Sequence, residues 1–297
     1  MGESRLRLSV VIPAYNEAAS IAKVLAGLQE ALNGIPDLAG AYEVLVVDDG
    51  STDDTAGQVR SLGWARLVVH PCNMGNGAAV KTGIRQAEGD LLLFMDADGQ
   101  HHAEQIREFL EGGERYDMVV GARGSGSQAG VHRRLANWIY NRLATYVTGR
   151  RVQDLTSGYR AIRRDVARRF VGLLPNGFSY PTTITLCLMR GGFSVHYLPI
   201  TASRRTGKSK IRPVTDGPRF LVVIMKICML FSPLKIFLPV SLYLFLMGVG
   251  YYAYTYWTTH RFTNMSMLLF TTAVVIFMMG LIAEQIAQMR LERSEDL

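Results

Sequence analysis

Short hydrophobic runs alternate with amphipathic segments over the first 121 residues of the chain. The runs are apolar at nearly every position rather than at every second one, which is typical of strands buried on both faces of a parallel sheet. The alternation therefore predicts an α/β fold with a mostly parallel sheet and helices on both faces. The expected strands are residues 8–12, 43–47, 66–70, 91–95 and 117–121, and the expected helices are residues 17–32, 78–88, 103–111 and a segment that begins at 51 or 52.

After residue 121 the alternation stops, and longer irregular segments separate the expected elements. Loops are expected at residues 125–130, 154–160 and 201–212, helices at 131–148 and 182–190, and one more strand at 193–200. The loop at 154–160 is polar and the loop at 201–212 is basic.

Two uncharged apolar stretches, residues 236–257 and 262–283, lie near the end of the sequence. A helix of about 22 residues rises roughly 33 Å, enough to cross a hydrocarbon core of about 30 Å. Two buried core helices are the alternative. The sequence therefore predicts a globular domain at residues 1–212, an amphipathic helix in the membrane interface at 213–233, a two-helix transmembrane hairpin at 234–289 and a short tail at 290–297.

More Lys and Arg residues lie on the two outer flanks of this hairpin than in its turn. They are Lys226 and Lys235 before the first stretch, Arg290 and Arg293 after the second, and His260 and Arg261 between them. The positive-inside tendency predicts that both termini and the large domain are cytoplasmic, in a protein that crosses the cell membrane twice. No signal peptide is expected, because the first residues run directly into a strand pattern.

The net charge of +7 conceals a segregation of charge along the chain. Residues 1–122 carry 9 Lys and Arg against 18 Asp and Glu, whereas residues 123–219 carry 18 against 3. An acidic half that can hold a cation is thus followed by a basic half suited to phosphates and a membrane surface. Nucleic acid is the alternative partner of a basic segment, but the hydrophobic end indicates lipid, so none is expected. Three scattered cysteines predict a reducing compartment without a disulfide framework.

Two carboxylates, Asp96 and Asp98, follow the apolar run at 91–95. On a strand, this spacing puts both side chains on one face, and ligands of open parallel sheets bind beyond the carboxyl ends of the strands. Hard oxygen ligands at that place suit Mg2+ or Mn2+ carrying a diphosphate, although an acidic turn is the simpler interpretation. The neighbouring His101 and His102 do not indicate zinc, because adjacent histidines point apart and no spaced Cys or His accompanies them.

Six motifs, taken together, connect the chain to a known family. They are Val11-Ile-Pro-Ala-Tyr-Asn-Glu17, Val46-Val-Asp-Asp-Gly-Ser-Thr-Asp53, Gly75-Asn-Gly-Ala-Ala-Val-Lys81, Met95-Asp-Ala-Asp-Gly-Gln-His101, Asp154-x-x-Ser-Gly-Tyr-Arg160 and Arg205-Thr-Gly-Lys-Ser-Lys210. The first four, in this order, resemble the family 2 glycosyltransferases of the Rossmann-like GT-A fold. The last two are similar to the polyprenyl-phosphate branch of that family, which includes dolichol-phosphate mannose synthase. The resemblance covers residues 8–212.

For the donor, the resemblance implies a UDP- or GDP-linked sugar. The residues that it assigns are Pro13, Tyr15 and Glu17 in the base and ribose pocket, Asp49 on the base or ribose, Asn73 and Lys81 beside the nucleotide, Asp96 on ribose or metal, and Asp98 and Gln100 on an Mg2+ or Mn2+ ion held to the diphosphate. Simpler roles stay open for Asp49 as a helix cap, for Lys81 as a solvated lysine, and for Gly75 and Gly77 in a tight turn.

For the acceptor, the resemblance implies a polyprenyl phosphate such as undecaprenyl or dolichyl phosphate. Its phosphate has a second pKa of about 6 and is therefore largely dianionic at neutral pH. Its reaction needs neutralisation of that charge and correct orientation rather than a strong base. The candidates for binding it are Arg123, Arg133, Arg160, Arg204, Arg205, Lys208 and Lys210. Asp154 either positions the acceptor or accepts a proton, and its alternative is a salt bridge to Arg160 or to another arginine. The residues expected to carry catalysis are Asp98, Arg123 and Asp154.

We therefore expect a membrane-bound, inverting transferase that forms a polyprenyl-phosphate monosaccharide and, by analogy, associates with itself. A processive polysaccharide synthase is one alternative, but its Gln-x-x-Arg-Trp motif is absent, because Trp64, Trp138 and Trp257 follow Gly, Asn and Tyr. A transferase acting on another lipid, such as a diacylglycerol, is a second alternative. A third is a non-catalytic membrane scaffold that binds nucleotide sugars.

The variant Lys208→Ala tests the acceptor assignment. It should raise the lipid-phosphate concentration needed for half-maximal transfer more than the nucleotide-sugar concentration, because the acceptor loses a cationic contact. Steady-state rates with each substrate varied in turn measure both quantities, and a selective loss of nucleotide-sugar affinity would contradict the assignment.

Overall fold

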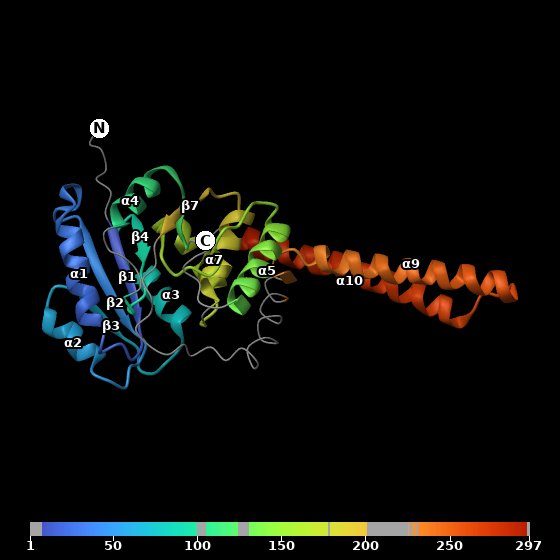
Figure 1. Ribbon diagram of the computed structural model, residues 1–297, viewed down its shortest axis with the longest axis horizontal. Helices are drawn as coiled ribbons and strands as arrows, with labels where there is room; N and C mark the ends of the chain where they lie inside the picture. Colours follow the sequence, from blue (N-terminus) through green and yellow to red (C-terminus); the bar gives the residue numbers. More distant parts are fainter. Residues whose placement is uncertain are drawn as a thin grey trace. The chain divides into compact units, whose positions relative to one another are not determined.

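A computed structural model describes residues 8–99, 105–123, 131–177, 179–200, 225, 228–229 and 231–295. The side chains of residues 131–137, 147 and 291–295 lie outside this description. The chain divides into two compact units, Met1–Ile211 and Arg212–Leu297. The first is an α/β domain and the second contains a helical hairpin (Figure 1).

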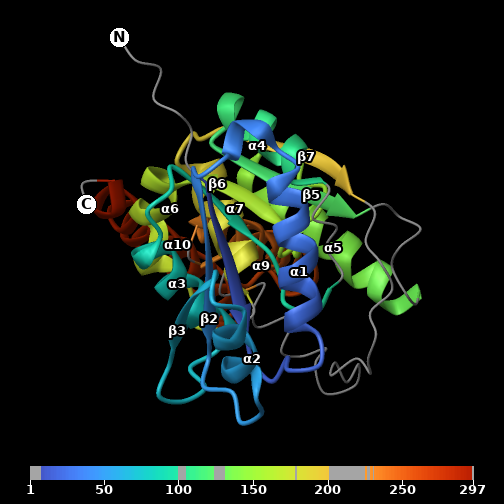
Figure 2. The same cartoon turned by 90° about the vertical axis from the view of Figure 1, so that its left-hand side faces the viewer.

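A single mixed sheet forms the centre of the first unit (Figure 2). Its strands in the described part of the chain are β1 (Leu8–Ala14), β2 (Tyr42–Asp48), β3 (Arg66–Val69), β4 (Leu91–Phe94), β5 (Met118–Arg123), β6 (Arg160–Arg163) and β7 (Val195–Ile200). They lie in the order β3-β2-β1-β4-β6-β5-β7. All neighbours are parallel except β6, which runs antiparallel to both β4 and β5. The predicted mostly parallel α/β fold is confirmed.

Helices cover both faces of this sheet. They are α1 (Ile21–Asn33), α2 (Thr55–Leu62), α3 (Asn76–Gln86), α4 (Ile106–Arg115), α5 (Val131–Thr148), α6 (Arg164–Phe170) and α7 (Tyr180–Arg190), with short 3-10 turns at Pro36–Leu38 and Val171–Leu173. On one face, Ile12 of β1, Leu25 of α1 and Phe109 of α4 belong to one buried cluster. On the other face α3 approaches β1 so closely that a Cβ at Gly83 would lie 2.3 Å from Cγ1 of Val11. Successive strand residues thus serve opposite layers, as the pleat requires.

The strand β6 is the main difference from the sequence prediction, which placed a polar loop at 154–160 and no strand directly after it. β6 has four residues, of which Ala161 and Ile162 are fully buried and both ends are arginine. So short an apolar pair between two charges does not produce a strand pattern in the sequence. Because β6 is reversed, the loop that precedes it enters the sheet at the edge where β4 and β5 end.

Two element boundaries also differ from the prediction. The strand β4 ends at Phe94, so Asp96 and Asp98 lie beyond it, and strand geometry does not put both on one face. The helix α1 begins at Ile21 rather than at residue 17. Asn16, in the loop before this helix, adopts a left-handed backbone with φ of 55°, and its side-chain oxygen accepts a hydrogen bond from the N–H of Thr52 in the loop after β2.

In the second unit, α9 (Leu234–Thr259) and α10 (Asn264–Glu295) lie side by side as a hairpin (Figure 1). Both helices are long and apolar enough to cross a membrane, and they overlap the two predicted spans. Their large side chains, such as Tyr243, Leu246, Trp257 and Ile282, are exposed. That exposure does not fit the alternative of buried core helices. The predicted amphipathic helix at 213–233 lies almost entirely outside the described residues.

Small residues at seven-residue intervals form the seam between α9 and α10. The buried members are Ser241, Gly248 and Thr255 on α9, and Ser266, Ala273, Gly280 and Ala287 on α10. A Cβ at Gly280 would lie 2.6 Å from Cβ of Phe237, and one at Gly248 would lie 3.0 Å from the Phe270 ring. A seven-residue repeat keeps one stripe facing the partner helix, and small residues let the backbones approach. The hairpin therefore packs through small residues and leaves its large ones for apolar surroundings.

The variant Gly280→Leu tests this seam, with Gly250→Leu as the matched control. Gly250 lies on α9, and a Cβ there meets nothing within 4 Å. Leucine at 280 should force the helices apart at a cost of about 1–3 kcal/mol, as overpacking usually does. Thermal unfolding in detergent should show a lower midpoint for the variant at 280 only, and equal midpoints would contradict the packing.

Candidate active site

One edge of the sheet gathers polar residues from segments that are far apart in the sequence. The carboxyl ends of β1, β2, β4 and β5 meet there, together with the amino end of the reversed strand β6. The charged residues at this edge include Asp48 and Asp49 at the end of β2, Asp96 after β4, Arg123 at the end of β5 and Arg160 at the start of β6. Acids from the acidic half thus meet arginines from the basic half.

The loops after β1 and β2 are bonded to each other. The backbone N–H of Asp49 donates to the carbonyl of Ala14 at 2.8 Å, and the N–H of Thr52 donates to Oδ1 of Asn16 at 2.8 Å. The residues expected in the base and ribose pocket differ in exposure. Pro13, near the end of β1, is buried, whereas on the loop Tyr15 is exposed and Glu17 is half-buried. The second loop therefore fixes the backbone that carries Tyr15 and Glu17.

The carboxylate of Asp49 holds the glycine-rich turn at 73–77. Asp49 is buried, with 2% of the residue's surface exposed. Its oxygens accept hydrogen bonds from the N–H groups of Met74 at 3.0 Å and Gly75 at 2.7 Å, and Oδ1 lies 2.8 Å from Nδ1 of His70. The other ring nitrogen of His70 lies 2.9 Å from the hydroxyl of Thr82. We expected Asp49 to contact base or ribose. The structure gives its carboxylate three partners inside the protein.

His70 did not emerge from the sequence as a site residue. It follows directly after β3, in the place that Asp48 and Asp49 occupy on β2. The signal available in the sequence was its position, because His70 is a polar residue directly after an apolar run. Its pairing with Asp49 arises because β2 and β3 are parallel neighbours in the sheet.

Lys81 also has a protein partner. Its ammonium donates to the side-chain oxygen of Asn176, and burial lowers the pKa of this lysine. The carbonyl of Asn176 accepts from the N–H of Ala78 at 3.1 Å, so the loop at 175–177 closes the start of α3. Asn176 lies 95 residues from Lys81, and nothing in the sequence predicts the contact. Asn73, the other residue expected beside the nucleotide, is exposed.

Asp96 and Asp98 lie just beyond β4, and both are half-buried. Two carboxylates at a strand end match the way Mg2+ is usually held, by one or two acids together with water and substrate phosphates. The donor set therefore fits Mg2+ or Mn2+. Within the described residues there is no group of three or more His, Cys, Asp or Glu that could hold a metal. The expected third ligand, Gln100, lies outside the described residues.

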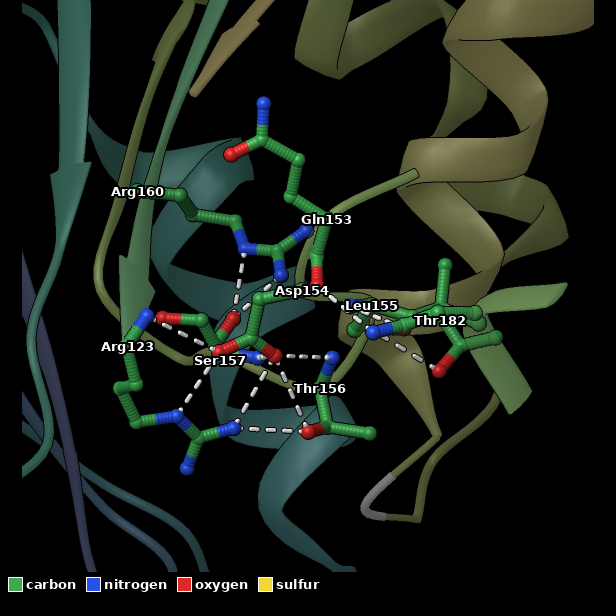
Figure 3. A network of polar contacts seen from close by, with 9 residues as sticks. Arg123, Gln153, Asp154, Leu155, Thr156, Ser157, Arg160 and Thr182 are labelled. Carbon is green, nitrogen blue, oxygen red and sulfur yellow. Dashed lines mark hydrogen bonds and ion pairs between the residues drawn. The ribbon is translucent and has the colours of Figure 1, made fainter. Parts of the chain in front are cut away.

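Arg123, at the end of β5, and Asp154 form a two-point ion pair at this edge (Figure 3). Nε of Arg123 donates to Oδ2 of Asp154 at 2.8 Å, and NH2 donates to Oδ1 at 3.1 Å and to the hydroxyl of Thr156 at 2.7 Å. The N–H groups of Thr156 and Ser157 donate to Oδ1 as well, at 3.0 and 3.1 Å. The salt-bridge alternative for Asp154 is thus realised with Arg123.

The charges of this pair stabilise each other. Burial by itself would raise the pKa of Asp154, but the hydrogen bonds and charge of Arg123 outweigh it and lower that pKa. Burial would likewise lower the pKa of Arg123, whereas Asp154 and then Asp96 raise it. An ionised carboxylate with donors on both oxygens is a poor proton acceptor. The geometry of Asp154 therefore suits positioning rather than proton transfer.

Arg160 lies in the interior and is 0% exposed. Its guanidinium donates to the carbonyls of Ser157 and Pro181 and to the hydroxyl of Thr185, the latter two at 2.8 and 3.0 Å. Burial lowers its pKa. We expected Arg160 to bind the acceptor phosphate. The structure instead encloses its donors among oxygens of the protein, where it ties the loop before β6 to α7.

The other basic residues expected at the acceptor are not described. The side chain of Arg133 lies outside the described residues, and so do Arg204, Arg205, Lys208 and Lys210. Their roles stay predictions.

Comparisons with known proteins cover both units. Residues 9–170 match glycosyl transferase family 2, and residues 232–289 match the GtrB C-terminal hairpin. Undecaprenyl-phosphate 4-deoxy-4-formamido-L-arabinose transferase of Proteus mirabilis is 30% identical over 190 residues, which are 59% of this chain and 57% of that protein. Undecaprenyl-phosphate mannosyltransferase of Micrococcus luteus is 30% identical over 220 residues, 69% of this chain and 88% of that one. The chain thus spans little more than half of the Proteus relative.

A solved structure has a fold similar to that of most of this chain. Glucosyl-3-phosphoglycerate synthase from Mycobacterium tuberculosis, in complex with Mn2+, UDP and phosphoglyceric acid, aligns with a TM-score of 0.57 at 22% identity. The alignment covers 75% of this chain and 78% of that one.

The Arg123–Asp154 pair predicts a pH-dependent loss of stability. A carboxyl whose folded-state pKa is lowered stabilises the fold above its unfolded pKa of about 3.9, and that contribution disappears as the pH falls through the folded value. Asp154→Asn should therefore cost about 2–4 kcal/mol at pH 7, because it leaves a largely buried arginine unpaired, and the difference from the wild type should shrink below about pH 4.

Denaturant unfolding of the full chain in detergent, from pH 7 to pH 3, measures this difference. The control is Asp90→Asn, because Asp90 pairs with Arg164 at 3.4 Å on the surface and should contribute little. Equal stability of the wild type and Asp154→Asn at pH 7 would contradict the pairing.

Proposed function

Because the chain belongs to glycosyl transferase family 2, we propose that it moves a monosaccharide from a nucleoside-diphosphate sugar to the phosphate of a polyprenyl lipid. Two kinds of finding support the acceptor class. The relatives from Proteus mirabilis and Micrococcus luteus are named as undecaprenyl-phosphate sugar transferases. The matched C-terminal hairpin consists of helices long and apolar enough to cross a membrane, where such lipids reside.

On the donor side, Asp96 and Asp98 would hold a divalent cation, Mg2+ or Mn2+. When bound, that ion supplies positive charge for the leaving diphosphate. Tyr15 and Glu17 carry the base and ribose pocket, on a backbone fixed by the neighbouring loop. The donor is UDP- or GDP-linked, and the anchoring of the glycine-rich turn by Asp49 and His70 keeps the edge of its pocket in place.

On the acceptor side, Arg123 is the described residue best placed to meet a phosphate. Two of its nitrogens donate to Asp154 and Thr156, and the third points away from Asp154 (Figure 3). Asp154 thus orients a cation that is partly exposed, with 29% of its side chain accessible. The basic segment at 201–212 adds further cations and steers the lipid headgroup by charge.

The proposed reaction is a single displacement. The acceptor phosphate is largely dianionic near neutral pH, because its second pKa is about 6, so it attacks the anomeric carbon without a strong base. Attack from the side opposite the leaving diphosphate inverts that carbon. Asp154 contributes by orienting the guanidinium of Arg123. The electrostatic stabilisation of the charge that develops in the transition state lowers the barrier more than this orientation does.

The proposed location is the cell membrane, with the α/β domain and both termini in the cytoplasm. The support is the excess of Lys and Arg on the two outer flanks of the hairpin over its turn. Self-association stays a prediction.

One observation carries the proposal: residues of the acidic half and of the basic half meet at the same edge of the sheet. Asp96 belongs to the acidic half, and Arg123 and Asp154 lie in the basic half. A donor cation and an anionic acceptor need such a juxtaposition of opposite charges. A scaffold that only binds nucleotide sugars does not need the basic residues for an acceptor phosphate.

The test is a transfer assay with the full chain in detergent. A panel of radiolabelled UDP and GDP sugars is offered with undecaprenyl phosphate, dolichyl phosphate or diacylglycerol, each with Mg2+ or Mn2+. We expect label on a polyprenyl phosphate, and none with Asp98→Ala, which should remain folded.

Label on the glycerolipid alone would overturn the acceptor class. Nucleotide-sugar binding without turnover of any donor would support the scaffold instead. Near-normal transfer by Asp98→Ala would contradict its role at the metal.

A further inference from the structure

The loop at 154–159 is held rigidly between two charged anchors. At its start, Asp154 binds Arg123 and the loop's own N–H groups, with the carboxylate 6% exposed. At its end, the buried guanidinium of Arg160 binds the carbonyl of Ser157 and the helix α7. The backbone between these anchors has little freedom to move.

The reversed direction of β6 puts one residue of this loop against Asp96. In the antiparallel pairing of β4 with β6, Phe94 lies opposite Arg160. Continuing that register by two residues along each chain brings Gly158 opposite Asp96. Facing residues of an antiparallel pair have their Cβ atoms only about 4.5–5.5 Å apart.

A side chain at Gly158 would displace the carboxylate of Asp96. A Cβ at position 158 would lie 2.7 Å from Oδ2, 3.0 Å from Oδ1 and 3.1 Å from Cγ of Asp96, and these are its three nearest atoms. Gly158 does not have the left-handed backbone that favours glycine, which distinguishes it from Gly75 with φ of 103°. The need for glycine at 158 therefore comes from the carboxylate and not from the backbone.

Tyr180, at the start of α7, interacts electrostatically with the same carboxylate. The hydroxyls of Ser157 and Tyr180 are buried, and neither has a hydrogen-bond partner among the described residues. Burial raises the pKa of Tyr180, the charge of Asp96 adds to that rise, and the charge of Arg160 opposes it. Tyr180 thus lies within electrostatic reach of Asp96 and Arg160. A methyl group at 158 would push the carboxylate out of a defined place between charged and polar neighbours.

We propose that Gly158 is a positioning residue for Asp96, and that the acceptor-side loop at 154–159 thereby sets the geometry of the donor-side carboxylate. Any disturbance of the loop is passed to Asp96 by direct contact. The ligand that Asp96 serves rests on the function proposed above, whereas the contact between Gly158 and Asp96 does not.

A double-mutant cycle tests the contact without any ligand. Gly158→Ala is made in the wild-type chain and in Asp96→Ala, and thermal unfolding of the full chain is followed in detergent. In the wild type, alanine should lower the midpoint by about 2–4 °C, a typical shift for one strained contact in a domain of this size. In Asp96→Ala the carboxylate is gone, so alanine should leave the midpoint unchanged or raise it slightly.

Equilibrium binding tests the positioning role. The probes are UDP and GDP in turn, titrated with Mn2+ and measured by calorimetry. Gly158→Ala should raise the Mn2+ concentration for half-maximal nucleotide binding by about tenfold, since groups that orient a metal ligand usually have effects of this size. The matched control is Gly172→Ala, where a Cβ meets nothing within 4 Å, and it should bind as the wild type does.

The outcomes separate this inference from the proposed function. Equal midpoint shifts in both backgrounds would overturn the contact, even if sugar transfer is observed. A coupled cycle with unchanged Mn2+ dependence would overturn the positioning role. If Gly158→Ala alone does not fold, a folded Asp96→Ala/Gly158→Ala chain supports the contact and an unfolded one overturns it. If the wild type binds neither nucleotide, the proposed function fails while the cycle still decides the contact.

Discussion

The antiparallel strand β6, inserted between β4 and β5, is the constraint on which the charged edge of the sheet depends. Its direction brings the loop before it to the carboxyl ends of both neighbours. Asp154 then reaches Arg123, and Gly158 reaches Asp96. A parallel strand in the same place would send that loop to the opposite edge of the sheet, and Asp154 and Gly158 would not reach Arg123 and Asp96.

Most polar residues at this edge hold one another rather than point outward. Asp49 is occupied by His70 and the glycine-rich turn, and Arg160 by carbonyls of its own loop and of α7. Buried polar groups are costly unless they are bonded, so a site built from many charges needs such an inner network. The network in turn limits the groups that remain for ligands to a few, and their positions are fixed before any ligand arrives. That preorganisation is what electrostatic catalysis requires.

The hairpin follows a different rule, because its exposed side chains are large and apolar and both helices are long enough to cross a membrane. In a bilayer, large hydrophobic side chains gain little from facing another helix, so close backbone packing decides the seam. The seven-residue spacing of small residues on both helices fits this rule, and Gly280 lies so close to Phe237 that a Cβ there would clash. Glu284 adds a polar contact, because its carboxylate accepts a hydrogen bond from the N–H of Leu234 at the start of α9 at 3.1 Å.

The sequence by itself determined the α/β class, six of the strands in close outline, the two long apolar helices and the place of Asp96 and Asp98 after a buried strand. These features depend on hydrophobic runs and their period, which are local properties of the chain. Only the tertiary structure decided that β6 exists and is reversed, that Asp154 pairs with Arg123, and that Arg160 is buried. Arg123 and Asp154 are 31 positions apart in the sequence. Arg160 begins β6, a strand of only four residues. Strand order and direction decide them, and no local pattern encodes either.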